Sequence, residues 1–261
     1  MVSNLAVVSL KAQLGQGVVV EQFSTIYEDV WIGDNTKIGP NVVVYPGTRI
    51  GSNCEIFPGA VIGAVPQDLK YAGEYTTCEI GNNTIIRECV TIHRGTTDKM
   101  KTAVGDNCLL MGYVHVAHDC QIGNNVILAN YVGLSGHVTI QDFAILEGKV
   151  AAQQFVTIGA HAFVGGASLI RKSIPPFVRV AREPLSYIGV NSVGLRRRDF
   201  SDEQVRVIED IYRILFVQNS NVKKAVDIIE SSIADCAERQ LILNFIKNEE
   251  RGIVRGWVSE F

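Results

Sequence analysis

Aliphatic residues recur at every sixth position along most of the chain. The row runs in one unbroken phase from Val8 to Ile170 and lapses only at Asp68, Glu74 and Asp98. An α-helix repeats its apolar positions every 3.6 residues and a half-buried strand every two, so neither explains the pattern. A period of six predicts a parallel β-helix, in which three hexads of strand and turn close one triangular coil and position i stacks on position i+18.

The residues between the periodic positions support short turns and two longer loops. A Gly-x-Asn sequence follows the periodic aliphatic at Gly33–Asn35, Gly39–Asn41, Gly51–Asn53, Gly81–Asn83, Gly105–Asn107 and Gly123–Asn125. Glycine and asparagine tolerate the positive φ that tight turns require. The lapses in the row predict loops at residues 63–79 and 94–103, and loops on a rigid scaffold often carry function.

The pattern changes after Ile170. Pro175, Pro176 and Pro184 interrupt regular structure, and a helical period begins at Ser201, which forms a capping-box sequence with Gln204. Three apolar stripes at helical spacing follow, at 205–215, 222–233 and 241–246. The sequence therefore predicts an all-β parallel β-helix over residues 1–190 and a small C-terminal α-helical domain over residues 191–261, which would cover the last coil and its open strand edge.

Composition narrows the functional classes. The net charge of −3 over 261 residues gives no general attraction to nucleic acid. Six cysteines without a CxxC pair indicate reduced thiols and a cytoplasmic protein. The N-terminus lacks the pattern of a signal peptide. No apolar run approaches the ~20 residues that cross a bilayer, so we expect no stable membrane insertion.

The stretch VHVAHDC, at residues 114–120, carries the strongest chemical signal. Adding 18 to His118 gives Gly136 and then Gln154, and adding 18 to Asp119 gives His137. These five residues should therefore converge at one corner of the solenoid. Histidine titrates near neutral pH, and a neighbouring carboxylate can fix its tautomer, so the pair suits general-base chemistry. The Gly136 N–H could approach a developing oxyanion.

A metal site is an alternative interpretation of the same histidines. His115, His118 and His137 could supply three imidazoles to zinc, as in a metal-dependent hydratase built on a hexapeptide solenoid. However, His115 projects onto position 133 one coil later, which leaves only two histidines close together. We therefore expect no metal and no other cofactor. A solenoid with a purely structural role also stays open, although it would have no need of the stack on His118.

Several longer motifs identify a family. They are QDLKYAGE (67–74), TIHRGT (91–96), AHDC (117–120), LSGH (134–137), QFVTIGAH (154–161), VGG (164–166) and GVN with GLRRR (189–191 and 194–198). In these motifs, and in their order, the chain resembles the UDP-N-acetylglucosamine O-acyltransferase family of lipid A biosynthesis. The resemblance implies a left-handed β-helix. It also implies transfer of a (3R)-3-hydroxyacyl chain from acyl carrier protein to the 3-hydroxyl of UDP-N-acetylglucosamine. The chain would be a homotrimer, with each site shared by two β-helices.

The resemblance also implies roles for individual residues. His118 would be the general base, Asp119 its orienting partner, and Gly136 the oxyanion donor. The remaining substrate contacts would come from Gln67, Asp68, Lys70, His115, His137, Gln154, Asn191 and Arg197. Gly166 would stand at the end of the acyl groove, where the missing side chain leaves room for chains of about fourteen carbons or more, each buried methylene adding ~0.8 kcal/mol.

Other residues bear on the donor and on the limits of the resemblance. Basic residues near the end of the solenoid would attract the acidic carrier protein: Arg171, Lys172, Arg179, Arg182 and Arg196 to Arg198. Gln153 and Val193 depart from the histidine and the glutamate that are found at these positions in family members. A related acyltransferase that acts on an amino sugar, or that uses a coenzyme A thioester, is the nearest alternative.

Overall fold

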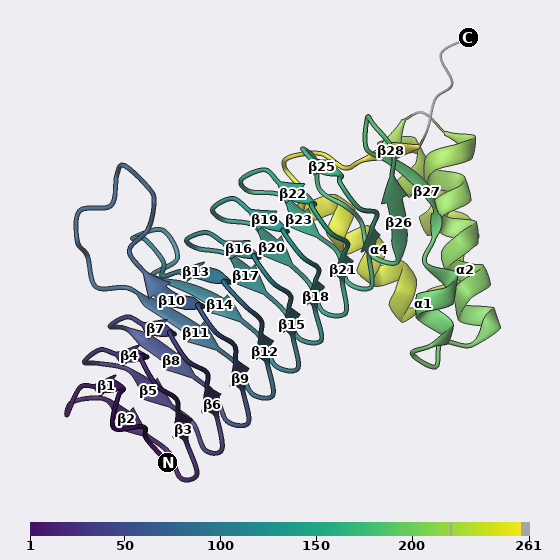
Figure 1. The fold of residues 1–261 in the computed structure, drawn as a ribbon. Coiled ribbons are helices and arrows are strands. Elements are labelled where there is room, and N and C mark those ends of the chain that lie inside the picture. The colour runs from purple at the N-terminus through teal and green to yellow at the C-terminus, as the bar shows by residue number, and fades with distance from the viewer. Residues whose placement is uncertain (220, 257–261) are drawn as a thin grey trace.

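The chain folds into a left-handed parallel β-helix with a group of helices at its C-terminal end (Figure 1). The computed structural model describes residues 1–219 and 221–256, so the expected C-terminal domain extends beyond the described residues at 257–261. Strands pair parallel with strands three places earlier and later in the chain, which produces three long sheets. The predicted fold class is confirmed.

Each turn of the β-helix contributes one strand to each sheet, and the sheets are named here in the order in which the chain enters them. The first sheet contains β1 (Val7–Val8), β4 (Thr25–Ile26), β7 (Val43–Val44), β10 (Val61–Ala64), β13 (Thr91–His93), β16 (His115–Val116), β19 (Gly133–Leu134), β22 (Ala151–Ala152) and β25 (Leu169–Ile170). The second contains β2 (Gln13–Leu14), β5 (Trp31–Ile32), β8 (Thr48–Ile50), β11 (Thr77–Ile80), β14 (Lys101–Val104), β17 (Gln121–Ile122), β20 (Thr139–Ile140) and β23 (Thr157–Ile158). The third contains β3 (Val19–Val20), β6 (Lys37–Ile38), β9 (Glu55–Ile56), β12 (Ile85–Ile86), β15 (Leu109–Leu110), β18 (Ile127–Leu128), β21 (Ile145–Leu146), β24 (Phe163–Val164), β26 (Val178–Ala181), β27 (Ser186–Val190) and β28 (Arg255–Gly256).

The period of six places one aliphatic of each strand inside the prism. From Val20 onward these side chains are buried, whereas the first two, Val8 and Leu14, are only half-buried because no coil precedes theirs. Strands of one sheet pair with those one coil away, as in Val116 with Leu134. The asparagines of the six Gly-x-Asn turns have φ between 55° and 57°, as expected of the left-handed region.

Most of the cysteines belong to this core. Cys54, Cys78, Cys108 and Cys120 each stand two positions before a periodic aliphatic and are buried. Burial raises the pKa of the Cys78 and Cys120 thiols to about 12, so these groups are protonated near neutral pH. Their role is to fill space close to the strands.

Two loops leave the solenoid where the periodic row lapses (Figure 1). They cover residues 65–76 and 94–100, and both are shorter than predicted because β10, β11 and β14 are longer than the other strands of their sheets. Each loop leaves from the first sheet and returns to the second, so both lie at the edge between these two sheets. His118 and Asp119 occupy the turn at the same edge, between β16 and β17.

The solenoid does not stop at Ile170. β26 continues the third sheet beyond the prolines and pairs antiparallel with β27, a hairpin that the sequence did not predict. The helical elements are α1 (Ser192–Arg196), α2 (Asp202–Tyr212), a π-helical turn (Arg213–Gln218), α3 (Val222–Ser232) and α4 (Ala237–Asn248). The capping box of Ser201 and Gln204 is confirmed, with both hydrogen bonds present.

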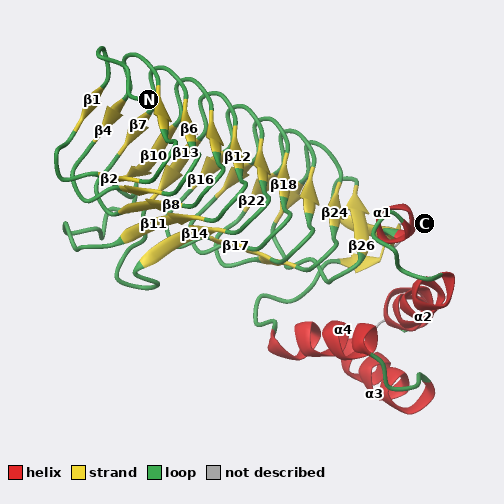
Figure 2. Cartoon of the chain, turned by 90° about the horizontal axis from the view of Figure 1, so that it is seen from below, coloured by secondary structure: helices red, strands yellow, loops and turns green. Residues whose placement is uncertain are grey.

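The helices do more than close the end of the solenoid. Tyr212 of α2 is buried and donates its hydroxyl to the Pro176 carbonyl on the last coil. Helix α4 lies alongside the second sheet, where Leu241 lines a hollow of about 470 Å³ together with Gln141 and Ala160. Figure 2 shows this placement of the helices beside the last coils. Among the described residues, no helix combines the length and the apolar character that a membrane span requires.

Candidate active site

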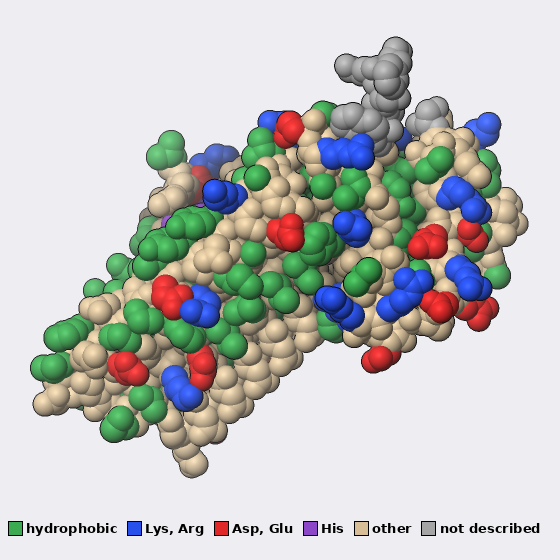
Figure 3. Space-filling model, turned by 45° about the vertical axis from the view of Figure 1, so that its right-hand side comes forward, with side chains coloured by type: hydrophobic (Ala, Val, Ile, Leu, Met, Phe, Trp, Pro, Cys, Tyr) green, Lys and Arg blue, Asp and Glu red, His purple; other side chains and the backbone are tan. Residues whose placement is uncertain are grey.

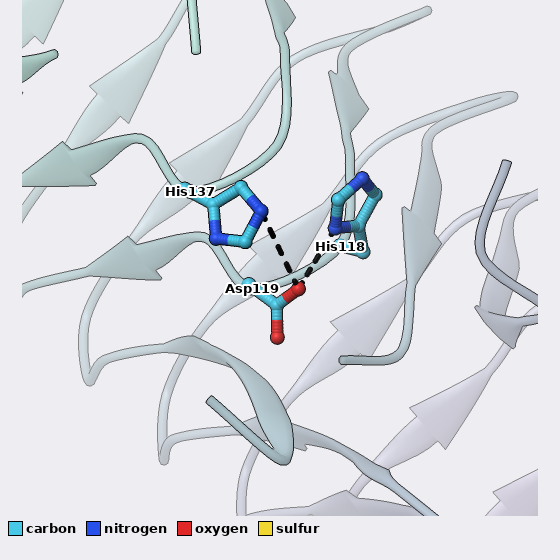
Figure 4. A group of neighbouring side chains, drawn as sticks. All are labelled: His118, Asp119 and His137. Carbon is cyan, nitrogen blue, oxygen red and sulfur yellow. Dashed lines mark hydrogen bonds and ion pairs between the residues drawn. The ribbon is translucent and has the colours of Figure 1, made fainter. Parts of the chain in front are cut away.

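His118 and Asp119 form a buried pair at the edge between the first and second sheets (Figure 4). The His118 Nδ1 lies 2.8 Å from the Asp119 Oδ2, and His118 is only 5% exposed. Because a carboxylate accepts hydrogen bonds, this contact keeps the proton on Nδ1 and leaves a lone pair on Nε2. The geometry therefore prepares Nε2 to accept a proton from a bound molecule.

The Asp119 carboxylate is held by the loop at 94–100. It accepts hydrogen bonds from the Thr96 N–H (2.9 Å), the Thr96 hydroxyl (2.6 Å) and the Lys99 N–H (3.2 Å). Burial by itself would raise the pKa of Asp119, but the hydrogen bonds from Thr96, His118 and Lys99 outweigh it and the pKa lies below its ordinary value. The group therefore stays ionised and fixes the orientation of the imidazole.

Gly136 lies directly over the His118 ring, as the offset of three hexads predicts. A Cβ at this position would lie 2.5 Å from the Cε1 and 2.7 Å from the Nε2 of His118, which no side chain can occupy without moving the ring. The Gly136 N–H makes no hydrogen bond to another residue within the described part of the chain. A donor without a partner beside Nε2 suits the role of an oxyanion contact.

A column of rings continues from this pair along the solenoid. His137 follows Asp119 one coil later, and its ring meets the His118 ring edge-on at 5.0 Å. Phe155, a further coil on, stacks on His137 at 4.3 Å with an interplanar angle of 8°. The His137 Nδ1 lies 3.0 Å from the Asp98 Oδ2, a separation that allows an ion pair although the alignment is not that of a hydrogen bond.

A cavity of about 230 Å³ opens beside this column. Both loops line it, together with the outer rings of the column, and its wall consists of Asp68, Lys70, Tyr71, Glu74, Thr96, Thr97, Asp98, His137 and Phe155. The structure therefore brings the expected residues Asp68, Lys70 and His137 to one cavity. Gln67 and Gln154 are exposed near it in sequence but are not part of its wall.

His115 belongs to a separate contact. It stands on β16 and pairs with Gly133, so it does not follow the corner column. Its Nδ1 lies 2.7 Å from the Thr91 hydroxyl, and its ring meets the ring of His93 edge-on at 4.9 Å. Burial lowers the pKa of His115. The pKa of His93 is lowered to about 4, first by burial and then by the repulsion that a protonated His93 would meet from the other two imidazoles, His115 and His118, in their charged forms. Both imidazoles are therefore neutral near pH 7.

Three expected residues lie elsewhere in the single chain. Gly166 lies in the turn from β24 to β25, at the edge between the third and first sheets, and its N–H donates to the Glu147 Oε2 (2.9 Å). Asn191 caps α1, accepting from the Gly194 N–H (3.3 Å) and donating to the His161 carbonyl (3.0 Å). Arg197 is exposed at the end of α1. A second chain would be needed to bring such positions to the His118 edge.

Two loop residues that contact Asp119 and His137 were not predicted from the sequence. Thr96 and Asp98 lie in the loop that breaks the periodic row, so adding multiples of 18 could not place them. The only available signal was that Thr96 closes the TIHRGT motif. Phe155, in contrast, lies one coil after His137 and could have been projected onto the column.

The site also offers donor atoms for a metal ion. One ligand atom each from His118, Asp119 and His137 lie within 4.8 Å of one another. The Asp119 Oδ2, however, already accepts from the Thr96 hydroxyl and from His118. An ion bound there would compete with these contacts. The described contacts are an imidazole held by a carboxylate and a backbone N–H without a partner beside it, an arrangement whose chemistry suits acyl transfer.

Comparisons with known proteins agree with this chemistry. A family model described as Udp N-acetylglucosamine O-acyltransferase, Domain 2, matches residues 174–254. A model of bacterial transferase hexapeptide repeats matches residues 11–45, 29–64 and 101–136.

Full-length relatives carry a more specific name. The acyl-[acyl-carrier-protein]–UDP-N-acetylglucosamine O-acyltransferase of Syntrophobacter fumaroxidans is 42% identical, over 96% of this chain and 98% of that protein. The protein of the same name from a Sulfurihydrogenibium species is 47% identical, over 95% of this chain and 92% of that protein. The solved UDP-N-acetylglucosamine acyltransferase of Bacteroides fragilis superposes with a TM-score of 0.96 at 45% identity, covering 98% of this chain and 100% of that one. The chain therefore belongs to the family of acyl-[acyl-carrier-protein]–UDP-N-acetylglucosamine O-acyltransferases.

Proposed function

We propose that this protein transfers a (3R)-3-hydroxyacyl chain from acyl carrier protein to the 3-hydroxyl of UDP-N-acetylglucosamine, the first step of lipid A biosynthesis. Membership of the family supports the reaction. The observation that carries the mechanism is the 2.8 Å contact between His118 and Asp119, with the Nε2 of His118 facing the Gly136 turn.

The proposed reaction uses the His118–Asp119 pair and the Gly136 N–H. The His118 Nε2 removes the proton of the sugar 3-hydroxyl as its oxygen attacks the thioester carbonyl, while Asp119 stabilises the imidazolium. The carbonyl oxygen gains charge and accepts the Gly136 N–H. When the intermediate collapses, the C–S bond breaks, the new C–O ester bond remains, and the thiolate takes the proton from Nε2. No oxidant, metal or cofactor enters this scheme.

We assign the cavity beside the column to the sugar nucleotide. Lys70 supplies a cation and Asp68 a carboxylate to the wall of this cavity, and His137 closes it beside the catalytic pair. Gln67 precedes Asp68 of the cavity wall, Gln154 precedes Phe155, and His115 lies on β16, the strand before the turn of His118. All three would contact the same substrates. Asn191 and Arg197 would reach the nucleotide from another chain.

A homotrimer completes the site in this proposal. His118 lies at the edge between the first and second sheets, and Gly166 at the edge between the third and first. A threefold assembly in which each first sheet faces the axis brings one edge of each chain against the other edge of the next. Exposed stacked tyrosines, Tyr113 on Tyr131 at 5.0 Å, lie at the edge of Gly166 and offer apolar surface to a neighbour. Light scattering should give three times the 28.6 kDa of one chain.

Two features bear on binding of the acyl donor: Gly166, for the acyl chain, and the charged residues of the surface, for the carrier protein. Gly166 is exposed, and a Cβ there would meet the Gly148 carbonyl at 3.3 Å, so larger side chains would project from the edge into the proposed acyl groove. Figure 3 shows Lys and Arg side chains over the C-terminal half of the molecule, interspersed with Asp and Glu. Lys172, Arg179, Arg171 and Arg196, four of the basic residues expected to dock the carrier protein, are exposed. Arg171 and Arg196 form ion pairs with Glu183 and Asp202.

The proposal includes a division of the chain into two units and a cellular location. Residues 1–190 would form the acyltransferase unit and residues 191–261 the helical unit. A cytoplasmic location is consistent with six cysteines that form no disulfide.

One set of assays separates this function from its alternatives. UDP-N-acetylglucosamine is offered with hydroxyacyl-acyl carrier protein or hydroxyacyl-coenzyme A, with and without a chelator, and its 3-amino analogue is offered in parallel. We expect turnover with the carrier-protein donor and the 3-hydroxyl acceptor, unaffected by chelation. Preference for the amino sugar or for coenzyme A would indicate the related acyltransferase. Loss of activity on chelation with recovery on zinc would indicate a metal site at His118, Asp119 and His137.

A further inference from the structure

The C-terminal segment places Arg251 against the column of rings that leads from His118 through His137 to Phe155. After α4 the chain turns back to the last coil, where the Gly252 carbonyl accepts the Ser173 N–H (3.0 Å) and the Val254 N–H donates to the Ser173 carbonyl (2.9 Å). Ser173 lies beside Thr157, whose N–H donates to the Ser173 hydroxyl (2.8 Å), and Ile174 bridges Ile158. The segment is therefore attached two residues along the chain from the turn that carries Phe155. Ile253 and Val254 are buried, which holds the segment in place.

The guanidinium of Arg251 lies over the ring of Phe155, with Cζ 4.8 Å from the ring centroid. Phe155 stacks on His137 at 4.3 Å, so that face of the ring is occupied and Arg251 must lie on the opposite face. His137 in turn meets His118. The column therefore runs from the general base through two rings to an exposed cation, and Phe155 is also part of the cavity wall.

Two other ring-stacked arginines hold ion pairs that Arg251 lacks within the described residues. Arg49 lies over Trp31 and pairs with Asp29 at 2.7 Å, and Arg87 lies over Phe57 and pairs with Glu88 at 2.9 Å. No such ion pair is present for Arg251 among residues 1–219 and 221–256, and the nearby Glu249 carboxylate accepts the backbone N–H of Arg251 (2.9 Å). Stacking fixes one face of the guanidinium and leaves its N–H edge for another acceptor.

We propose that Arg251 is a substrate-binding residue that contacts a phosphate group at the active site. The inference rests on the proposed function, because both substrates of that reaction carry phosphate: the diphosphate of the sugar nucleotide and the phosphodiester of the carrier protein's pantetheine arm. A guanidinium offers phosphate two parallel N–H donors together with its charge. Phe155 and the anchored segment 252–254 position the donors in advance, which lowers the entropic cost of the contact.

The test compares wild-type protein with Arg251→Gln and Arg251→Lys. Arg206→Gln is the matched control, since Arg206 is an exposed arginine on α2 and its replacement removes the same charge. Steady-state kcat and KM are measured for UDP-N-acetylglucosamine and for two donors, hydroxyacyl-phosphopantetheine and hydroxyacyl-pantetheine, which differ only in the phosphate. Thermal melting is recorded for every variant.

Arg251→Gln should raise one KM about tenfold, the loss expected for one charge-assisted contact, with kcat nearly unchanged. If the contact is to the donor, the variant loses the wild-type preference for phosphopantetheine over pantetheine. If it is to the nucleotide, the KM for UDP-N-acetylglucosamine rises and the donor preference remains. Arg251→Lys should restore part of the loss, and Arg206→Gln should behave as wild type.

Two results would overturn the inference. One is unchanged KM for all substrates in Arg251→Gln. The other is an equal loss in Arg251→Gln and Arg251→Lys that follows a lower melting temperature, which would make Arg251 an anchor of the segment. If the wild-type protein does not acylate UDP-N-acetylglucosamine even with hydroxyacyl-acyl carrier protein as donor, the proposed function fails and the inference falls with it. These outcomes are distinct, because only the last one affects the wild type.

Discussion

Replacing Gly136 by alanine should inactivate the protein by moving His118. The new methyl carbon would lie 2.5 Å from the His118 Cε1 and 2.7 Å from its Nε2, whereas carbon atoms in contact are separated by about 3.5–4.0 Å. The ring must therefore move by roughly 1 Å, which breaks the 2.8 Å contact with Asp119. A displacement of about 1 Å can cost about 10²-fold in rate. Alanine keeps the backbone N–H, so the loss would come from the ring and not from the oxyanion contact.

The assay is kcat with saturating UDP-N-acetylglucosamine and hydroxyacyl-acyl carrier protein. We expect kcat to fall by about 10²-fold or more, with a small change in melting temperature, because the imidazole can swing aside while the core stays intact. Gly133→Ala is the control for an added methyl group: a Cβ at Gly133 meets no atom within 4 Å. It should melt as wild type and keep most of its activity. A Gly136→Ala variant with normal kcat would refute the close approach and the placement of the base.

Four further predictions follow from the same geometry. His118→Ala should lose about 10²–10⁴-fold in kcat while melting close to wild type, and near-normal turnover would exclude His118 as the base. Gly166→Met should shift donor preference from long chains of about fourteen carbons toward about ten, since each buried methylene is worth ~0.8 kcal/mol; an unchanged ratio in a competition assay would show that Gly166 does not limit chain length. Charge reversal at Lys172 and Arg179 should raise KM for the carrier-protein donor and weaken its salt dependence, and an unaffected KM would place the docking surface elsewhere. Burial, followed by the charge of Arg198, lowers the pKa of His161 to about 4, so between about pH 6.5 and 4 the unfolded state takes up a proton that the folded state does not, and the free energy of unfolding falls as the pH falls. His161→Phe should reduce this loss of stability in urea titrations at several pH values. An equal loss in the variant would contradict the buried neutral imidazole.

The β-helix and the centre of the site could be predicted because they depend on a single repeat distance. From Val104 to Ile170 the phase of six is unbroken, so adding 18 to His118 and Asp119 gave Gly136 and His137 as neighbours. The structure shows both: Gly136 lies over the His118 ring, and the His137 Nε2 lies 3.9 Å from the Asp119 Oδ2. The same arithmetic separated His115 from the corner, and its pairing with Gly133 agrees.

The remaining parts depend on tertiary contacts that no period encodes. Thr96 and Asp98 belong to a loop whose path is set by the carboxylate and imidazole that it meets. The hairpin of β26 and β27 follows prolines that ordinarily end strands, because the third sheet offers a further edge on which to pair. Arg251 lies far beyond Phe155 in the sequence, and only the return of the C-terminal segment to Ser173 brings the two together.

Asn191 has a structural role in addition to the binding role predicted for it. Asn191 was expected to reach the nucleotide. In the structure its side-chain oxygen accepts the Gly194 N–H at the start of α1, and its side-chain nitrogen donates to the His161 carbonyl in the β-helix. Such a cap can stabilise a helix by about 1 kcal/mol. Replacement of Asn191 would therefore affect stability as well as any nucleotide contact, so its role in binding stays a prediction.

The chemical identity of the product tests the proposed reaction and the role of His118 together. Purified protein is incubated with UDP-N-acetylglucosamine and (3R)-3-hydroxyacyl-acyl carrier protein, and the product is identified by mass and by the NMR shift of the acylated sugar carbon. We expect one hydroxyacyl ester on the 3-oxygen, one free carrier-protein thiol for each ester formed, and no such product with His118→Ala. An acylated nitrogen, an ester at another hydroxyl, or equal product formation by His118→Ala would contradict the proposal.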